Sequence, residues 1–231
     1  MIVYPLKNIL ETLYKNEAAT KYNTRDIIYE NSNSIFADGK SLSKSEIKEI
    51  KKAAEADLIT FFRGNFHCEK NKEIEAFLYD YDHAVRFQKE SRARTFIITN
   101  DKSLNKIYGY FTLSILLFGN KTSKEEKFIS NTKLRKLQGY SAPNDETVYW
   151  GFLIAQLGRN DGISKELLDL DKILSFIKTE LAKAKEIVGG SVIMLEAVNN
   201  EKLIKKYEEV GFKYLQTVSP YKQLFIWDDE Y

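Results

Sequence analysis

The chain has 231 residues, of which 43% are hydrophobic and 29% are charged, and its formal net charge is +2. This composition is typical of a globular protein and excludes a wholly disordered chain. One cysteine excludes an internal disulfide and two histidines leave little for a zinc site, so we expect a reduced, cytoplasmic compartment and no metal. No apolar run approaches the roughly 20 residues that span a bilayer. The start of the chain also lacks the layout of a secretory signal, so no membrane partner is expected.

Residues 1–57 are expected to form a helical extension packed on the remainder of the chain. Helices are predicted over residues 6–18 and 43–56, with turn formers and a short strand between them. The second helix begins with Ser43 as N-cap and Glu46 three residues on, which is the capping-box arrangement. Up to residue 60, basic and acidic residues number nine each, which disfavours a DNA-binding arm.

From residue 58 the hydrophobic pattern becomes more regular. The run Leu58–Phe62 is interpreted as a short strand. A helix is predicted over residues 73–90, because apolar residues recur there every three or four positions: Ile74, Phe77, Leu78, Tyr81 and Val85. Residues 95–99 and 107–118 are rich in β-branched and aromatic residues, and they are predicted to form a hairpin.

Residues 119–147 form a long, basic connection between predicted strands. Between Phe118 and Tyr140, its positive residues outnumber its negative ones by four, six against two: Lys121, Lys124, Lys127, Lys133, Arg135 and Lys136 against Glu125 and Glu126. One interpretation is a solvated surface. The other is a binding surface for a phosphate-bearing substrate, on which Tyr140 would stack.

The last third of the chain alternates strands with helices. Strands are predicted over residues 149–157 and 191–198, helices over 167–188 and 201–209, and a terminal hairpin over 212–218 and 221–227. Gly189 and Gly190 are expected to end the long helix. Hairpins followed by alternating elements predict an α/β (α+β) domain over residues 58–231, with a mixed, mostly antiparallel sheet.

The loop after the strand 149–157 has the composition of a phosphate-binding loop. A strand that leads through a glycine loop to a helix N-terminus directs free N–H groups and the helix dipole at one spot. Here the loop reads Arg159-x-x-Gly162-x-Ser164. It resembles the Gln/Arg-x-x-Gly-x-Gly/Ala loop of the GNAT N-acetyltransferases, which holds the pyrophosphate of coenzyme A, and Ser164 departs from the last position.

A second signature of that family follows in the expected order. Ala197-Val198-Asn199-Asn200, then Tyr207 and Gly211-Phe212, resemble its Ala-x-Asn, Tyr and Gly-Phe pattern. The resemblance implies the GNAT fold, with two splayed central strands flanked by helices, and acetyl-CoA as cofactor. The pantetheine arm would pair with the backbone of the first splayed strand, at Ile154, Ala155, Gln156 and Leu157. The pyrophosphate would bind to the loop residues Arg159, Asn160, Asp161, Gly162, Ile163 and Ser164.

The resemblance also places a general acid at Tyr207, to protonate the sulfur of coenzyme A. The alternative is a core tyrosine, since Leu203, Ile204 and Tyr207 share a helix face. Asn199 is expected to bond the pantetheine, or to cap the following helix. Glu196 is a candidate general base, or an inward carboxylate that orients a backbone amide. The lone histidines are interpreted as structural, and no acetyl-cysteine is expected at Cys68.

A looser resemblance concerns the acceptor of the acetyl group. Phe66 and Cys68 before Phe77-Leu78 resemble a GNAT branch that includes toxins of toxin–antitoxin pairs, which acetylate aminoacyl-tRNA. This resemblance implies tRNA binding through Lys133, Arg135 and Lys136. A small amine or a peptide amine is the alternative acceptor. The alternative to an enzyme is a catalytically silent module that binds acyl-CoA or a protein. The sequence leaves open whether the protein forms a homodimer.

Overall fold

The computed structural model describes residues 1–31, 33–100, 104–119, 148–190, 192–219 and 222–227. The elements in chain order are β1 (Ile2–Pro5), α1 (Leu6–Tyr22), β2 (Ile27–Asn31), β3 (Ser34–Ala37), β4 (Lys40–Ser41), α2 (Lys44–Asn65), α3 (Lys72–Tyr79), α4 (Ala84–Lys89), β5 (Arg94–Thr99), β6 (Ile107–Gly119), β7 (Val148–Arg159), α6 (Leu170–Val188), β8 (Ile193–Val198), α7 (Glu201–Glu209), β9 (Phe212–Ser219) and β10 (Lys222–Trp227). The predicted basic connection, with Lys133, Arg135 and Lys136, lies outside the described residues.

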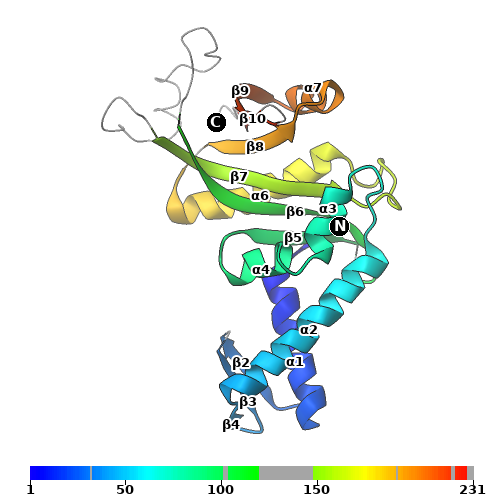
Figure 1. The fold of residues 1–231 in the computed structure, drawn as a ribbon, viewed down its shortest axis with the longest axis vertical. Coiled ribbons are helices and arrows are strands. Elements are labelled where there is room, and N and C mark those ends of the chain that lie inside the picture. The colour runs from blue at the N-terminus through cyan, green and yellow to red at the C-terminus, as the bar shows by residue number, and fades with distance from the viewer. Residues whose placement is uncertain (32, 101–103, 120–147, 191, 220–221, 228–231) are drawn as a thin grey trace. The chain divides into compact units, whose positions relative to one another are not determined.

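The described strands form the predicted mixed, mostly antiparallel sheet, in the order β1-β5-β6-β7-β8-β10-β9 (Figure 1). A small second sheet has the order β2-β3-β4. The chain divides into two compact units: unit 1 comprises residues 1–110 and 158–168, and unit 2 comprises residues 111–157 and 169–231. No helix among the described residues combines the length and apolar character needed to cross a membrane.

The N-terminal part of unit 1 is less helical than predicted. Its first residues form β1, which pairs antiparallel with β5, so that Ile2 faces Thr99 and Pro5 faces Phe96. Residues 27–41 form the small sheet between the two long helices. The division at residue 57 stays a prediction, and α2 runs across it.

The predicted capping box is confirmed, but the predicted strand at Leu58–Phe62 is wrong. The Ser43 side chain accepts a hydrogen bond from the N–H of Glu46, whose carboxylate accepts one from the N–H of Ser43, and α2 begins there. Leu58 and Phe62 are buried residues of α2, since they continue the apolar spacing of Ile50 and Ala54. The short apolar run is therefore the end of a long helical face rather than a strand.

The single helix predicted over residues 73–90 is two helices, α3 and α4. The chain leaves α3 at Asp80, whose Oδ1 atom accepts a hydrogen bond from the N–H of Asp82 at 3.0 Å. Such a local side-chain bond competes with the helical one and turns the chain. His83, which was expected within the helix, is the N-cap residue of α4.

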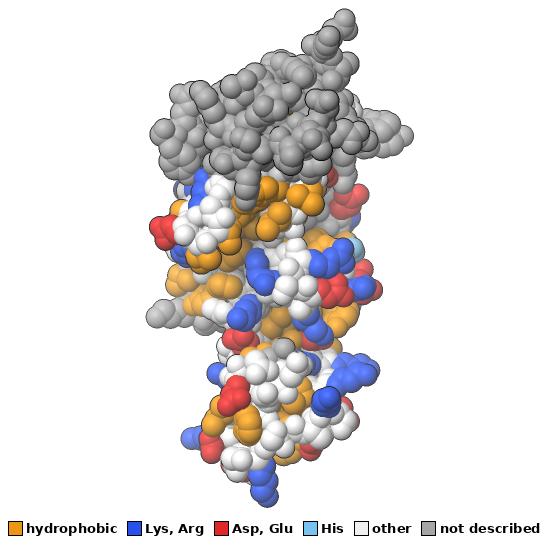
Figure 2. Space-filling view, turned by 90° about the vertical axis from the view of Figure 1, so that its left-hand side faces the viewer, with side chains coloured by type: hydrophobic (Ala, Val, Ile, Leu, Met, Phe, Trp, Pro, Cys, Tyr) orange, Lys and Arg blue, Asp and Glu red, His pale blue; other side chains and the backbone are white. Residues whose placement is uncertain are grey.

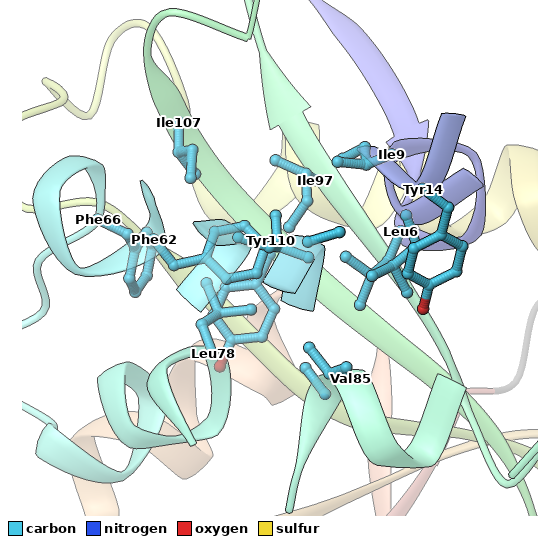
Figure 3. Packing of buried hydrophobic residues seen from close by; sticks show 14 of the residues in the cluster. Leu6, Ile9, Tyr14, Phe62, Phe66, Leu78, Val85, Ile97, Ile107 and Tyr110 are labelled. Atoms are coloured by element: carbon cyan, nitrogen blue, oxygen red, sulfur yellow. The ribbon is translucent and has the colours of Figure 1, made fainter. Parts of the chain in front are cut away.

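The core of unit 1 lies between its helices and the strands β5 and β6 (Figure 3). Tyr110 on β6 is fully buried, and its ring stacks on Phe77 of α3 at a centroid distance of 5.9 Å. Its hydroxyl donates to the carbonyl oxygen of Ile74 at 2.8 Å. Burial raises the pKa of this phenol well above its usual range, so it stays a hydrogen-bond donor.

At the surface, hydrophobic side chains of the described residues lie between charged ones (Figure 2).

In unit 2 most predicted elements are confirmed, although the helix predicted to start at residue 167 starts at Leu170. Asp169 is the N-cap residue, and its Oδ1 atom accepts a hydrogen bond from the N–H of Lys172 at 2.9 Å. The helix ends at Gly189, whose φ of 71° suits glycine. The helix α7 and the hairpin β9–β10 lie where they were predicted.

Candidate active site

The predicted site residues belong to both units, and each group is described within its own unit. The loop residues Arg159 to Ser164 lie in unit 1. The strand residues 154–157, together with Glu196, Asn199 and Tyr207, lie in unit 2.

In unit 2, β7 and β8 pair over only part of their length. Their parallel ladder joins Phe152 to Ile193, Leu153 to Met194 and Ile154 to Leu195, and it has no further pair in the described part of the chain. β7 continues to residue 159 and β8 to residue 198. Beyond the last pair, the edge of β7 that faces β8 has no strand partner among the described residues, which agrees with the predicted splay.

At the other end of the ladder, the two strands can approach each other closely because residue 151 is a glycine. A Cβ atom at this position would lie 2.8 Å from the carbonyl oxygen of Val192, which is too close for any side chain. Along the unpaired segment, Ala155 is exposed, and the side chains of Gln156 and Leu157 are half-buried. The backbone of these three residues lies beyond the last described pair with β8.

In unit 1, the loop is held by the buried side chain of Asn160. This side chain is 5% exposed, and its Nδ2 atom donates to the carbonyl oxygens of Asn65 at 2.7 Å and Ile107 at 2.8 Å. Its Oδ1 atom accepts a hydrogen bond from the N–H of Gly162 at 3.1 Å. All the hydrogen-bonding groups of the amide but one lone pair are used, so Asn160 fixes the loop against the strand β6 and the end of α2.

A second set of bonds ties the loop to the segment 67–69. The backbone N–H of Asp161 donates to the carbonyl oxygen of His67 at 2.8 Å. In return, the Oδ2 atom of Asp161 accepts a hydrogen bond from the N–H of Glu69 at 2.7 Å. The sequence analysis did not assign this role to residues 67–69, because nothing in their composition points to a partner 92 residues away.

The remaining N–H groups of the loop are partly used inside the protein. The N–H of Ile163 donates to the carbonyl oxygen of Asn160 at 3.0 Å, and the guanidinium of Arg159 donates to the carbonyl oxygen of Ile163. Gly162 and Ser164 are exposed, whereas Ile163 is buried. The loop therefore has a fixed shape before any ligand binds.

The loop is followed by a turn, and not directly by the helix N-terminus that the sequence analysis placed there. The carbonyl oxygen of Ser164 accepts hydrogen bonds from the N–H groups of Leu167 and Leu168, both at 3.2 Å. The pKa of the exposed Glu166 carboxyl is lowered, first by its own backbone N–H and then by the Ser164 hydroxyl. The carboxylate of Glu166 therefore adds a negative charge to the segment after the loop.

Tyr207 lies on α7 with its ring in the core of unit 2. Its ring centroid is 5.9 Å from that of Phe212 and 6.4 Å from that of Phe225, and the residue is 8% exposed. Burial raises the pKa of the phenol to about 12. Among the described residues, none forms a hydrogen bond with its hydroxyl. The ring thus packs as a core residue, and the hydroxyl remains a protonated donor.

The other two predicted residues of unit 2 lie on and after β8. Glu196 is half-buried and faces Leu224 of β10 in the antiparallel ladder. Asn199 is exposed, and the residue that caps α7 is Asn200, whose Oδ1 atom accepts from the N–H of Leu203 at 3.2 Å. The alternative role of Asn199 as the helix cap is therefore wrong.

The environment of Cys68 is that of a small buried hydrophobe. The side chain is 7% exposed, and burial raises the pKa of the thiol. Its backbone N–H donates to the Glu75 carboxylate at 2.7 Å. Since the thiolate is the nucleophilic form, this environment does not favour a covalent acetyl-cysteine.

Comparison of the sequence with protein-family models and with curated proteins finds no match. Solved structures do match. The toxin AtaT in complex with acetyl-methionyl-tRNAfMet matches with a TM-score of 0.54 and 20% identity, over 71% of this chain and 86% of that chain. A tyrosine-to-phenylalanine variant of KacT matches with a TM-score of 0.54 and 18% identity, over 75% and 89%. AtaTR bound with acetyl-CoA matches with a TM-score of 0.50 and 18% identity, over 70% and 84%. The chain therefore shares its fold, the GNAT fold, with these structures.

Proposed function

We propose that the chain is an acetyl-CoA-dependent N-acetyltransferase. The observation that carries the proposal is the end of the β7–β8 ladder at Ile154 and Leu195. Beyond it, the backbone of residues 155–157 offers N–H and C=O groups to an extended ligand, in the manner of an added strand. The pantetheine arm of coenzyme A is extended and carries amide groups, so it has the chemistry to occupy this position.

We assign the pyrophosphate of the cofactor to the loop around Gly162. Gly162 is an exposed residue without a side chain that could obstruct an anion, and its N–H, which donates to Asn160 at 3.1 Å, would be shared with a phosphate oxygen. The guanidinium of Arg159 supplies a positive charge to the same loop. The carboxylates of Asp161 and Glu166 oppose an anion there, and the bond from the N–H of Glu69 offsets the first of them.

We assign the general acid to Tyr207. The acceptor amine, in its neutral form, attacks the thioester carbonyl carbon, so that a C–N bond forms and the C–S bond breaks. The leaving sulfur then takes the proton of the Tyr207 hydroxyl. A phenol with a pKa of about 12 is protonated at neutral pH and can donate. In this scheme Glu196 takes the proton of the amine, directly or through a water molecule.

For the acceptor we propose an aminoacyl-tRNA, with the charged amino acid supplying the amine. The support is the similarity of fold to AtaT, whose complex contains acetyl-methionyl-tRNAfMet. Contact with the RNA through Lys133, Arg135 and Lys136 stays a prediction, as do a cytoplasmic location and a homodimer. A small amine or a peptide amine is the alternative acceptor.

The proposal is tested in two steps. Isothermal titration with acetyl-CoA should show binding to the wild type and none to Gly162→Asp, which places a carboxylate in the loop. Radiolabelled acetyl-CoA is then incubated with charged tRNA, with a polyamine or with a lysine-containing peptide. Transfer to charged tRNA supports the acceptor. Transfer only to the polyamine or the peptide would show that the acceptor is a different amine. Binding of acetyl-CoA without any transfer would support the catalytically silent module instead.

A further inference from the structure

A groove in unit 1 has no part in the proposed reaction. Its volume is about 850 Å³, which is within the range of roughly 300–1,000 Å³ that ligand pockets occupy. We propose that this groove binds an acidic, partly apolar peptide segment of a partner protein. None of the residues assigned to acetyl-CoA lines it, so the proposal goes beyond the proposed function and does not depend on it.

The groove runs along one side of α2 and is lined by five lysines: Lys44, Lys48, Lys51, Lys52 and Lys89. Lys44, Lys48 and Lys52 follow one another at intervals of four residues, so they form a row with a rise of about 6 Å per step. Up to residue 60 the chain carries equal numbers of basic and acidic residues. The fold therefore concentrates positive charge on one side of a segment that is neutral as a whole.

Glu55, the one acidic residue among the described residues that line the groove, is already neutralised. The Glu55 side chain is buried, and its Oε1 atom accepts hydrogen bonds from the Tyr14 hydroxyl and from the Lys89 ammonium, both at 2.7 Å. No carboxylate among the described residues forms an ion pair with Lys44, Lys48 or Lys52. The row of lysines on α2 thus presents a positive charge that an acidic ligand can neutralise.

Burial adds a reason for an anion to bind at this place. The pKa of Lys51 is lowered, first by burial and then by the positive charge of Lys89. Two cations are therefore held near each other in partly desolvated surroundings. The Glu55 carboxylate offsets part of this repulsion. A second carboxylate that enters the groove would offset the rest, and its attraction is weakened less by salt than that of a fully exposed pair.

The apolar part of the lining favours a peptide over a nucleic acid. Ile47, Ile59 and Tyr81 line the groove together with the lysines, and the Lys89 ammonium is 5.1 Å from the centroid of the Tyr81 ring. A concave, apolar floor receives side chains such as leucine, as in the recognition of amphipathic helices. Lysine stems extend this apolar surface while their ammonium groups remain at the rim. A phosphate backbone would use the rim and leave the floor unfilled.

The test uses the full chain and a short fluorescein-labelled peptide built from glutamate and leucine at helical spacing. Fluorescence polarisation should show binding that weakens as salt is added. Replacing leucine with serine in the peptide should weaken binding at constant charge. Equal binding of the serine peptide would overturn the apolar part of the proposal.

Two protein variants with the same net charge separate the groove from general electrostatics. The variant Lys44→Glu, Lys48→Glu, Lys52→Glu reverses the row and should weaken binding by about tenfold or more. The control Lys40→Glu, Lys70→Glu, Lys106→Glu reverses exposed lysines outside the groove and should bind as the wild type does. Both variants must retain the wild-type circular dichroism spectrum and unfolding midpoint.

Two outcomes would overturn the proposal. Equal loss of binding in the two variants would show a non-specific charge effect. Binding of tRNA that is lost only in the row variant, with no binding of the acidic peptide, would assign the groove to a nucleic acid. Because neither measurement uses acetyl-CoA, failure here leaves the proposed acetyltransferase untouched.

Discussion

The Oδ1 atom of Asn160 accepts a hydrogen bond from the backbone N–H of Gly162, at 3.1 Å, from inside the protein. The same side chain donates to two backbone carbonyls, and it is almost fully buried. The exposed residue Gly162 is thus positioned by a buried neighbour. The shape of the loop depends on this amide together with the bonds between Asp161 and residues 67–69.

Asn160→Leu keeps the size of the side chain and removes its hydrogen bonds. It leaves the carbonyls of Asn65 and Ile107 without a partner, and an unsatisfied buried group costs about 1–3 kcal/mol. We expect the free energy of unfolding, measured with urea, to fall by at least this amount. Acetyl-CoA affinity should fall as well. Asn8→Leu, at an exposed position of α1, should change neither, and a similar loss in both variants would contradict the role of Asn160.

Gly158 precedes the loop at a position where a side chain cannot fit. A Cβ atom there would lie 2.4 Å from the Cγ2 atom of Ile74. Gly158→Ala should therefore destabilise the protein by about 1–3 kcal/mol through overpacking. In the background of Ile74→Ala, which removes that methyl group, the same substitution should cost less. Equal costs in the two backgrounds, by urea unfolding, would show that the contact is not responsible.

Tyr207→Phe removes only the hydroxyl of a residue whose ring is packed in the core. If this hydroxyl protonates the leaving sulfur, kcat should fall by about 10²- to 10⁴-fold, with little change in acetyl-CoA affinity. Tyr214→Phe removes a hydroxyl that lies 2.8 Å from that of Thr217, and it should leave kcat unchanged. Wild-type turnover in Tyr207→Phe would return Tyr207 to a purely structural role.

The buried phenol of Tyr207 also predicts a pH dependence of stability. Burial raises its pKa from 10.0 to about 12, so the folded state favours the protonated form. This contribution is fully present below pH 10 and is lost as the pH rises towards 12. Between these values the wild type should lose stability more steeply than Tyr207→Phe. Parallel curves from urea unfolding at each pH would show that the phenol is not desolvated in the folded protein.

Tyr14→Phe tests the buried network under the lysine groove. The Tyr14 hydroxyl donates to the Glu55 carboxylate at 2.7 Å, and burial, followed by this bond, raises the pKa of Tyr14 above its usual range. Hydrogen bonds to charged groups contribute about 1.5–3 kcal/mol, so we expect a loss of this size in the free energy of unfolding. Tyr4→Phe serves as the control. An equal free energy of unfolding in the two variants would show that the Tyr14–Glu55 hydrogen bond does not stabilise the protein.

The elements of unit 2 could be predicted from local signals. The Asn-Asn pair before Glu201 and the glycine at Gly211 bracket α7, and its bounds agree with the prediction, although the capping residue is Asn200 and not Asn199. In unit 1, the apolar spacing continued through Tyr81 and concealed the break that Asp80 makes by its side-chain bond. Leu58–Phe62 was ambiguous because a short apolar run fits a strand or the end of a buried helix equally well.

The candidate site could be predicted only in its composition. Gly162 and Tyr207 were identified by their resemblance to family motifs, and their roles stay predictions. The partners of Asn160 were not predictable, because Asn65 and Ile107 are 95 and 53 residues away and only their backbone carbonyls take part. The basic groove was concealed in a segment whose charges balance, since composition does not say which face of a helix each lysine occupies.

The end of the β7–β8 ladder also limits what else can bind there. The segment of β7 beyond its last pair with β8 is five residues long, 155–159, so its length is about 17 Å. In the sheet order β7 lies between β6 and β8 and is not an outer strand. The opening therefore gives little opportunity for edge-to-edge aggregation. An occupant should slow hydrogen exchange at those amides that face β8, without any change in the rest of the sheet.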